Sequence, residues 1–247
     1  MTKNNTQLHL IKAIFLAFGL FTAIITYSGC SSSSSPSDQS TVTTSTQMEN
    51  SSVSASHLKS SDVITSGLTC DSVVITKARI VISTLKLHHD DADTNGQGTI
   101  KAGPFVAEFD ASGATFLSTV TVPPGNYDRI KFEIHKLDDK ADASLLNNPI
   151  FGDFVNGGRY TVIIDGKVYV NGASFDFSFK SSKTDNVTIF ITPPATFSAG
   201  ASYNLAFVFD PKLVFGQPGL RPLDPRSTDN QSAIEKLIKD ALKALKK

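Results

Sequence analysis

Residues 73–87 have the sequence VVITKARIVISTLKL, and this stretch decides the fold class. Apolar and polar side chains alternate along most of it, which is typical of a β-strand with one buried face. The alternation changes phase by one residue near Ser83-Thr84. A β-bulge at that point would return Leu85 and Leu87 to the buried face. The stretch therefore predicts a long, interrupted strand at the start of a β-rich domain.

Similar alternating runs continue along the chain and are separated by turn residues, including Asp165-Gly166, a strong two-residue hairpin signal. Strands that each have one apolar face require a second layer to cover it. We therefore expect an all-β domain over residues 68–215, built as an antiparallel two-sheet sandwich, with a closed barrel as the alternative. The predicted strands after the first lie at 105–109, 115–122, 127–137, 160–164, 167–170, 175–179, 187–191 and 203–209.

The charge composition argues against one class of partner. The chain has 23 basic and 23 acidic residues, which gives a formal net charge of zero at pH 7. Proteins that bind nucleic acids concentrate basic residues on one face. We therefore expect no nucleic-acid partner.

The N-terminus has the three parts of a secretory signal peptide. Residues 1–12 contain Lys3 and Lys12 and no acid, residues 13–25 are continuously apolar, and small residues precede Cys30. The apolar run is shorter than the roughly 20 residues that span a bilayer. We therefore expect residues 1–29 to be removed on export.

The segment Tyr27-Ser28-Gly29-Cys30 resembles the lipobox of bacterial lipoproteins. The resemblance implies cleavage before Cys30 and attachment of diacylglycerol and an acyl chain such as palmitate to that residue, which anchors the protein to a membrane. Ser31, in place of Asp, favours the outer membrane if the bacterium is Gram-negative. An ordinary signal peptide with a chance cysteine is the alternative.

The segment that follows the lipid site is rich in Ser and Thr. Apolar residues are sparse in residues 31–67, so burial cannot offset the entropy lost on ordering. We expect residues 30–67 to form a disordered tether that starts with the lipidated Cys30. The second cysteine, Cys70, then lacks an intramolecular partner, and we expect a buried free thiol at a strand start.

The C-terminal part predicts a linker and a helix. Residues 216–231 are rich in Pro, Gly and polar residues, which is typical of a linker. Residues 232–247 place apolar side chains at helical spacing and lysines elsewhere, with Ser232 and Glu235 as a capping box. We expect one amphipathic helix there. It would dock on its own domain, bind a partner, or lie on a membrane surface.

Two short motifs resemble a family of uncharacterised bacterial lipoprotein domains. They are Ile75-Thr76-Lys77-Ala78 and the Pro123-Pro124-Gly125-Asn126-Tyr127 turn, which continues to Ile130 as a PPGxYxxI pattern. The resemblance covers about residues 70–210. It implies a Greek-key, prealbumin-like sandwich on the cell envelope, and it implies no catalytic residues.

One loop contains candidate metal ligands. Asp91, Asp93 and Asn95, followed by Gly96, match the first half of a calcium-binding loop, in which alternating oxygens converge on one cation. The second half of the calcium-loop motif does not match, because Ala102 occupies the position where a bidentate Glu is expected. We therefore expect weak Ca²⁺ binding or a solvated polar loop.

Two neighbouring groups bear on that metal site. His88 and His89 are adjacent on a strand and point to opposite faces, which argues against a transition-metal site. Asp138, Asp139 and Asp142 could supply missing calcium ligands if the fold brings them close. His135 is expected to be exposed.

The sequence supports binding better than catalysis. It contains no nucleophile elbow, zinc-protease motif, phosphate-binding loop or dinucleotide fingerprint. We therefore expect a membrane-anchored envelope module for binding, adhesion or structural support, whose candidate partners are an envelope protein or a glycan. The alternative is an envelope enzyme, such as a hydrolase, with an unrecognised site.

Overall fold

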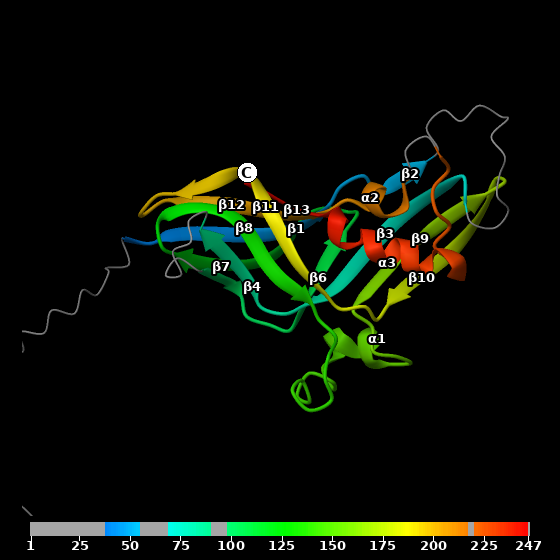
Figure 1. Cartoon of the computed structure of the whole chain (residues 1–247), viewed down its shortest axis with the longest axis horizontal. Coiled ribbons are helices and arrows are strands. Elements are labelled where there is room, and N and C mark those ends of the chain that lie inside the picture. Colours follow the sequence, from blue (N-terminus) through cyan, green and yellow to red (C-terminus); the bar gives the residue numbers. More distant parts are fainter. Residues whose placement is uncertain (1–37, 55–68, 90–97, 217–219, 247) are drawn as a thin grey trace, which may run out of the picture. The chain divides into compact units, whose positions relative to one another are not determined.

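The computed structural model describes residues 38–54, 69–89, 98–216 and 220–246. As predicted, these residues are mostly β (Figure 1). The strands are β1 Ser40–Met48, β2 Ser52–Ser54, β3 Ser72–Ile82, β4 Leu85–His89, β5 Gly98–Lys101, β6 Phe105–Asp110, β7 Thr115–Val122, β8 Gly125–Ile134, β9 Val162–Val170, β10 Ala173–Ser181, β11 Asp185–Phe197, β12 Ser202–Phe209 and β13 Leu242–Lys246. The helical segments are η2 Pro149–Phe151, α1 Gly152–Val155, α2 Pro211–Phe215, η3 Thr228–Asn230, α3 Gln231–Leu237 and η4 Lys239–Ala241.

The strands form one connected, mixed sheet. Its order is β10-β9-β3-β8-β11-β13-β12-β1-β7, with β2 and β6 paired to β3, and with β4 joining β5 to β8. Most neighbours are antiparallel, but β1–β12 and β11–β13 are parallel, so the prediction of a purely antiparallel arrangement is wrong for these pairs. The two exceptions involve the first and last strands of the chain. Neither is joined to its parallel neighbour by a short hairpin, and only such a turn would impose an antiparallel direction.

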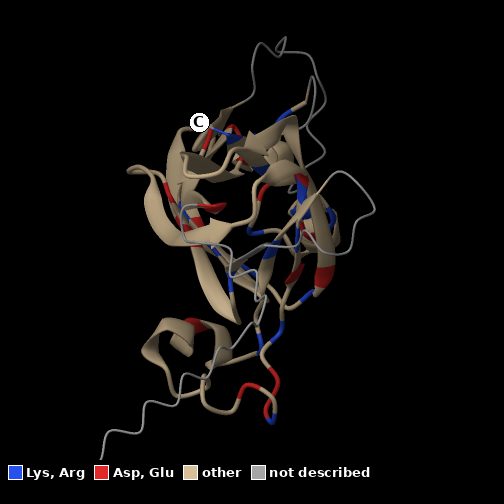
Figure 2. Cartoon of the chain, turned by 90° about the vertical axis from the view of Figure 1, so that its left-hand side faces the viewer, with Lys and Arg blue, Asp and Glu red and all other residues tan. Residues whose placement is uncertain are grey.

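The sheet is curled (Figures 1 and 2), and β5 lies in contact with β7. Side chains rather than a backbone ladder join these two strands. Lys101 Nζ donates to the Leu117 carbonyl at 3.3 Å, and Ser118 Oγ donates to the Ile100 carbonyl at 3.0 Å. Phenylalanines fill the concave side, and the Phe207 ring meets those of Phe109 and Phe132 edge-on, with 5.3 Å between centroids in both pairs.

The predicted interruption near Ser83-Thr84 is present. Strand β3 ends before these residues and β4 begins after them, and both strands pair with β8. The chain stays attached through Ser83, whose N–H donates to the Glu133 carbonyl and whose hydroxyl accepts from the Glu133 N–H, both at 3.0 Å. Leu85 and Leu87 are fully buried, as the phase change predicted.

The predicted tether is wrong where it overlaps β1 and β2. Strand β1 lies between β12 and β7, and its alternate side chains at Ser40, Val42, Thr44 and Thr46 are buried. Backbone carbonyls accept hydrogen bonds from two of these hydroxyl groups: Ser40 Oγ donates to the Ser198 carbonyl at 2.8 Å, and Thr46 Oγ1 donates to the Glu108 carbonyl. The Thr44 hydroxyl is buried without a partner among the residues that the structure describes. Threonine, being β-branched, also favours strands. Cys30 itself lies outside the described residues.

The predicted linker and C-terminal helix need correction too. Part of the linker is packed: Leu223 pairs with Thr69, and the Cys70 N–H donates to the Pro222 carbonyl at 3.0 Å. Helix α3 docks on its own domain and ends at Leu237. Residues 242–246 then form β13, which enters the sheet between β11 and β12. The gap between those two strands requires a partner, and this requirement overrides the helical periodicity.

A smaller apolar cluster covers the outer side of β3 and β9. Phe151 and Phe154, from the segment around α1, pack there on Val81 and Ile163. Arg79 on the same side pairs with Asp153 at 2.6 Å and with Asp165 at 3.0 Å. This segment therefore protects one end of the sheet and leaves the outer faces of β4, β8 and β11 open.

Candidate functional site

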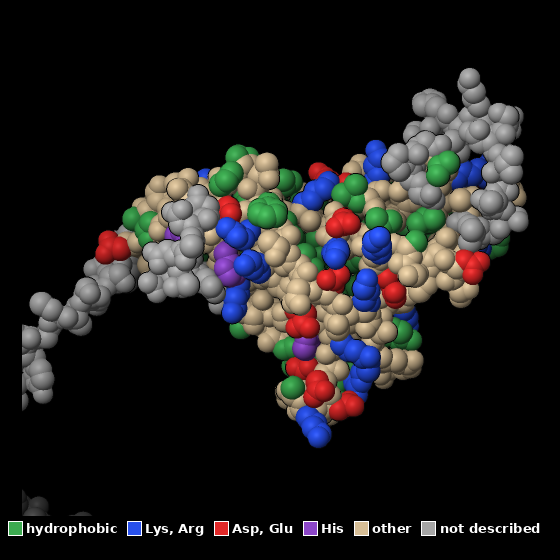
Figure 3. Space-filling view, viewed as in Figure 1, with side chains coloured by type: hydrophobic (Ala, Val, Ile, Leu, Met, Phe, Trp, Pro, Cys, Tyr) green, Lys and Arg blue, Asp and Glu red, His purple; other side chains and the backbone are tan. Residues whose placement is uncertain are grey.

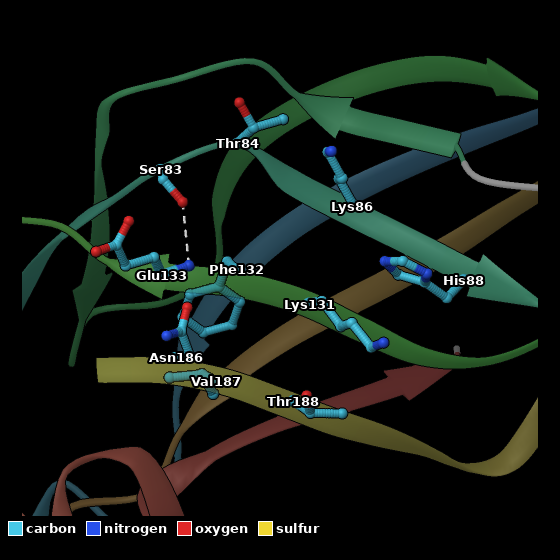
Figure 4. A pocket seen from close by; sticks show the side chains of 10 residues that line it. All are labelled: Ser83, Thr84, Lys86, His88, Lys131, Phe132, Glu133, Asn186, Val187 and Thr188. Carbon is cyan, nitrogen blue, oxygen red and sulfur yellow. Dashed lines mark hydrogen bonds between the residues drawn. The ribbon is translucent and has the colours of Figure 1, made fainter. Parts of the chain in front are cut away.

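An open groove runs over the outer faces of β4, β8 and β11, and we call it the β8 groove (Figure 4). It encloses about 460 Å³. Three adjacent strands supply its walls, so the sheet backbone fixes the spacing of its side chains. Its lining residues are Ser83, Thr84, Lys86, His88, Lys131, Phe132, Glu133, Asn186, Val187 and Thr188.

Strand register sets these side chains in rows. Lys86 of β4 is opposite Lys131 of β8, which is opposite Thr188 of β11. In the next row, Arg129 of β8 stands between His88 of β4 and Phe190 of β11. Directly opposite residues have Cβ atoms about 4.5–5.5 Å apart. The two lysines therefore lie side by side in the groove. Arg129, which pairs with Asp128 at 2.6 Å, and Phe190 lie beside its lining.

The electrostatic character of the β8 groove is positive. Neither Lys86 nor Lys131 forms an ion pair with any residue that the structure describes. Partial burial lowers the pKa of His88, and the charges of Lys131, Arg129 and Lys86 lower it further, whereas Asp128 opposes the shift. Figure 3 shows basic and histidine side chains gathered on this face. The groove is therefore suited to negatively charged groups.

The other end of the groove is different. Glu133 lines it, and its carboxylate lies 3.6 Å from His135 Nδ1. The opposite nitrogen of that ring, Nε2, lies 3.0 Å from the buried Asp142 carboxylate. His135 is therefore a partly buried bridge rather than the exposed residue that we expected.

The acidic residues Asp138, Asp139 and Asp142 form contacts within their own loop and with Arg159. Asp142 accepts from the Asp138 N–H at 2.8 Å, and the Asp138 carboxylate accepts from Lys140 N and Ala141 N, both at 2.8 Å. Asp139 pairs with Arg159. The Asp138 and Asp142 carboxylates therefore hold the loop in its own conformation by accepting hydrogen bonds from its backbone.

The PPGxY motif holds the end of β4 in place beside the groove. The Tyr127 hydroxyl donates to the Pro123 carbonyl at 2.8 Å, and its ring packs on His89 at 4.1 Å between centroids. A side chain at Gly125 would overlap the His89 ring. His88 and His89 thus point to different sides, as expected, with His88 in the groove and His89 packed on Tyr127.

The predicted metal ligands Asp91, Asp93 and Asn95 lie outside the described residues, and Ca²⁺ binding there stays a prediction. Within the described parts of the chain, no three His, Cys, Asp or Glu side chains are grouped closely enough to hold a metal ion. The second cysteine is buried and free, as predicted. Burial, and then the nearby Asp224 and Asp71, raise the pKa of the Cys70 thiol to about 12. That thiol is therefore not an activated nucleophile.

No catalytic pair is assembled in the described region. The ring nitrogens of His88, His89 and His135 form no hydrogen bond there with a serine, threonine or cysteine side chain. Nucleophilic catalysis usually needs such a contact between the nucleophile and its base. The groove offers cations, hydroxyl groups, an amide and the Glu133 carboxylate, which are groups that can hold a polar ligand.

Local alternation accounts for part of the β8 groove. In the predicted strand 127–137, Arg129, Lys131 and Glu133 alternate with buried apolar residues, and Lys86 lies between the buried Leu85 and Leu87. The neighbours of β8 were not predictable because β4 and β11 are far from it in sequence. That Lys86 and Lys131 lie opposite each other is therefore known only from the pairing of β4 with β8.

Comparison with known proteins gives no relative for this chain. No family model, no curated protein and no solved structure matches it. No helix among the described residues is long and apolar enough to cross a membrane.

Proposed function

We propose that this protein is a lipid-anchored lipoprotein of the bacterial envelope whose folded domain binds a ligand in the β8 groove. The observation that carries the binding role is the row Lys86–Lys131–Thr188, which three adjacent strands present on an open face. Strand pairing fixes the spacing of these residues, so the backbone need not rearrange when a ligand binds.

The anchor is supported by the sequence of residues 1–30. The supporting features are the signal peptide and the lipobox-like Ser28-Gly29-Cys30, and only nine residues separate Cys30 from β1, which begins at Ser40. Residues 31–39 can span at most about 30 Å when extended. In this proposal the domain stays near the membrane surface, in the outer membrane if the bacterium is Gram-negative.

The anchor is tested with Cys30→Ala. We expect the wild-type chain to incorporate radioactive palmitate and to sediment with membranes. The variant should do neither. Equal palmitate labelling of both chains would show that Cys30 is not the lipid site.

The binding role is tested on the full chain carrying Cys30→Ala, so that a lipid does not contribute. Polysaccharide and protein fractions of the bacterial envelope are immobilised, and binding is compared with that of the same chain carrying Lys131→Gln. We expect one fraction to bind the first chain more strongly. Release of sugar or peptide fragments from a fraction would instead favour the alternative, a hydrolase.

A further inference from the structure

We infer that the ligand of the β8 groove is an acidic polysaccharide, which binds with its carboxylates on Lys86 and Lys131. This inference rests on the proposed function and specifies its ligand class. Three properties of the groove carry it: an uncompensated pair of lysines, a lining of neutral polar groups, and one exposed aromatic ring beside the cations.

The first property is the like-charged pair. Lys86 and Lys131 stand opposite each other on neighbouring strands, and neither pairs with an acid in the described part of the chain. Like charges in directly opposite positions destabilise a sheet. A bound carboxylate would accept from both ammonium groups and turn this repulsion into attraction. The free protein therefore carries a cost that an anionic ligand removes.

The second property is the polar lining between and beyond the cations. Thr84, Thr188 and Asn186 offer hydroxyl and amide groups, and Glu133 offers a carboxylate at one end (Figure 4). The Glu133 carboxylate can accept hydrogen bonds from the hydroxyl groups of a sugar unit, while the carboxylates of the same chain lie on the lysines. The mixture therefore fits an acidic polysaccharide, which carries free hydroxyl groups on every sugar, better than a nucleic acid, whose backbone presents phosphates and few hydroxyl groups.

The third property is Phe190, whose side chain is on the outer face of β11 and is 65% exposed. It stands opposite Arg129, two residues along the strand from Thr188. An exposed ring beside hydrogen-bonding groups can pack on the apolar face of a sugar. A bilayer would need a convex or flat surface with several apolar side chains, whereas this surface is hollowed and basic.

The experiment uses the full chain with Cys30→Ala and a defined probe, oligomers of polygalacturonic acid. Binding is measured by calorimetry at low and at high salt. We expect Lys131→Gln and Lys86→Gln each to weaken binding about tenfold, because each removes a charge-assisted hydrogen bond. High salt should weaken binding of the starting chain in the same direction. Binding that is unchanged by these substitutions would place the ligand elsewhere and overturn the inference.

Matched controls use sites away from the groove. Lys236→Gln removes an exposed lysine of α3, and Phe116→Ser removes a ring on β7 that is 67% exposed, close to the exposure of Phe190. We expect both controls to bind like the starting chain, and Phe190→Ser to bind more weakly. Equal losses for Phe116→Ser and Phe190→Ser would overturn the role of the aromatic ring and with it the sugar-specific part of the inference.

Three further probes separate the ligand classes. Neutral dextran should bind at least tenfold more weakly than polygalacturonate, as should single-stranded DNA and vesicles that contain anionic lipids. Stronger binding to DNA or vesicles, lost in Lys131→Gln, would assign the groove to that class instead. If no polysaccharide probe binds but an envelope protein fraction still binds through Lys131, the inference fails while the proposed binding function stands.

A second readout follows His88 by NMR. Its imidazole faces Lys86 on its own strand and Lys131, Arg129 and Asp128 on β8. A bound carboxylate offsets the three cations, so polygalacturonate should raise the pKa of His88 towards its ordinary value. An unchanged or lowered pKa in the bound state would contradict binding in this row.

Discussion

Ile191 of β11 pairs in parallel with Ala244 of β13, and both side chains are 2% exposed. The last strand of the chain therefore lies inside the sheet, with β11 on one side and β12 on the other. Without it, each of these two strands would lose its partner on one edge, because among the described strands β11 would keep only β8 and β12 only β1.

The first prediction concerns Ala244→Asp. An aspartate there would bury a charge without a partner, so the free energy of unfolding should fall by about 3–5 kcal/mol. Urea denaturation of the full chain measures this. The control is Ala233→Asp, because Ala233 is exposed on α3 and near its N-terminal end, where an acid is tolerated. Similar stability of the two variants would show that β13 is not part of the core.

The C-terminus also shows why the sequence predicted the wrong element. Apolar residues from Ile234 to Leu245 fit a helical face, but the last part, Leu242–Lys246, also alternates as a strand does. A run this short is compatible with both, and local pattern cannot decide. The strand conformation is selected by residues far away in the sequence, because β11 and β12 each offer an unpaired edge to residues 242–246.

The N-terminal strand was missed for a related reason. Residues 40–48 are almost free of strongly apolar side chains, and a low hydrophobic content predicts disorder. The hydroxyl groups of Ser40 and Thr46 find carbonyl acceptors in β6, β7 and the turn before β12, and only the fold supplies these acceptors. The strands with strong alternation, such as β3 and β8, were predictable, whereas the row that pairs Lys86 with Lys131 required the fold itself.

The second prediction concerns Gly125→Ala. The new methyl group would overlap the His89 ring, which is wedged against Tyr127, so we expect a loss of about 1–3 kcal/mol in unfolding free energy. In Gly125→Ala/His89→Ala the overlap is gone. The double variant should therefore lose less stability than the sum of the two single variants. Strict additivity in urea denaturation would show that the two residues do not compete for this space.

The third prediction concerns pH and Cys70. Its thiol pKa is raised from 9.0 to about 12 in the fold, first by burial and then by Asp224 and Asp71. Above pH 9 the unfolded chain releases this proton while the folded chain keeps it. Stability from the thiol is therefore full below pH 9 and is lost between pH 9 and 12, by about 1.4 kcal/mol per pH unit.

The comparison that isolates this effect is between Cys30→Ala and Cys30→Ala/Cys70→Ala. Lysines and tyrosines titrate in the same range in both chains, so only the difference between them reports Cys70. We expect the unfolding free energy of the first chain to fall more steeply above pH 9. Parallel curves from pH 7 to pH 12 would mean that the folded thiol ionises as readily as a free one.

The fourth prediction concerns Lys131→Gln in the absence of ligand. Lys131 faces Lys86 across the β4–β8 pair, so removing its charge relieves the repulsion between the two ammonium groups. The unfolding free energy should rise by about 0.2–1 kcal/mol at low salt, and the gain should shrink at high salt because ions screen exposed charges. Lys236→Gln, which removes an exposed lysine outside the row, should not show this gain.

The same Lys131→Gln variant should gain less thermal stability from polygalacturonate than the starting chain, because a ligand that binds more weakly stabilises the folded state less. A residue that serves binding rather than stability is expected to behave in this way: its removal stabilises the free protein and weakens ligand binding. If Lys131→Gln instead lowers stability at low salt, the lysine pair is not repulsive in the free protein, and the first of the three properties that point to an anionic ligand is lost.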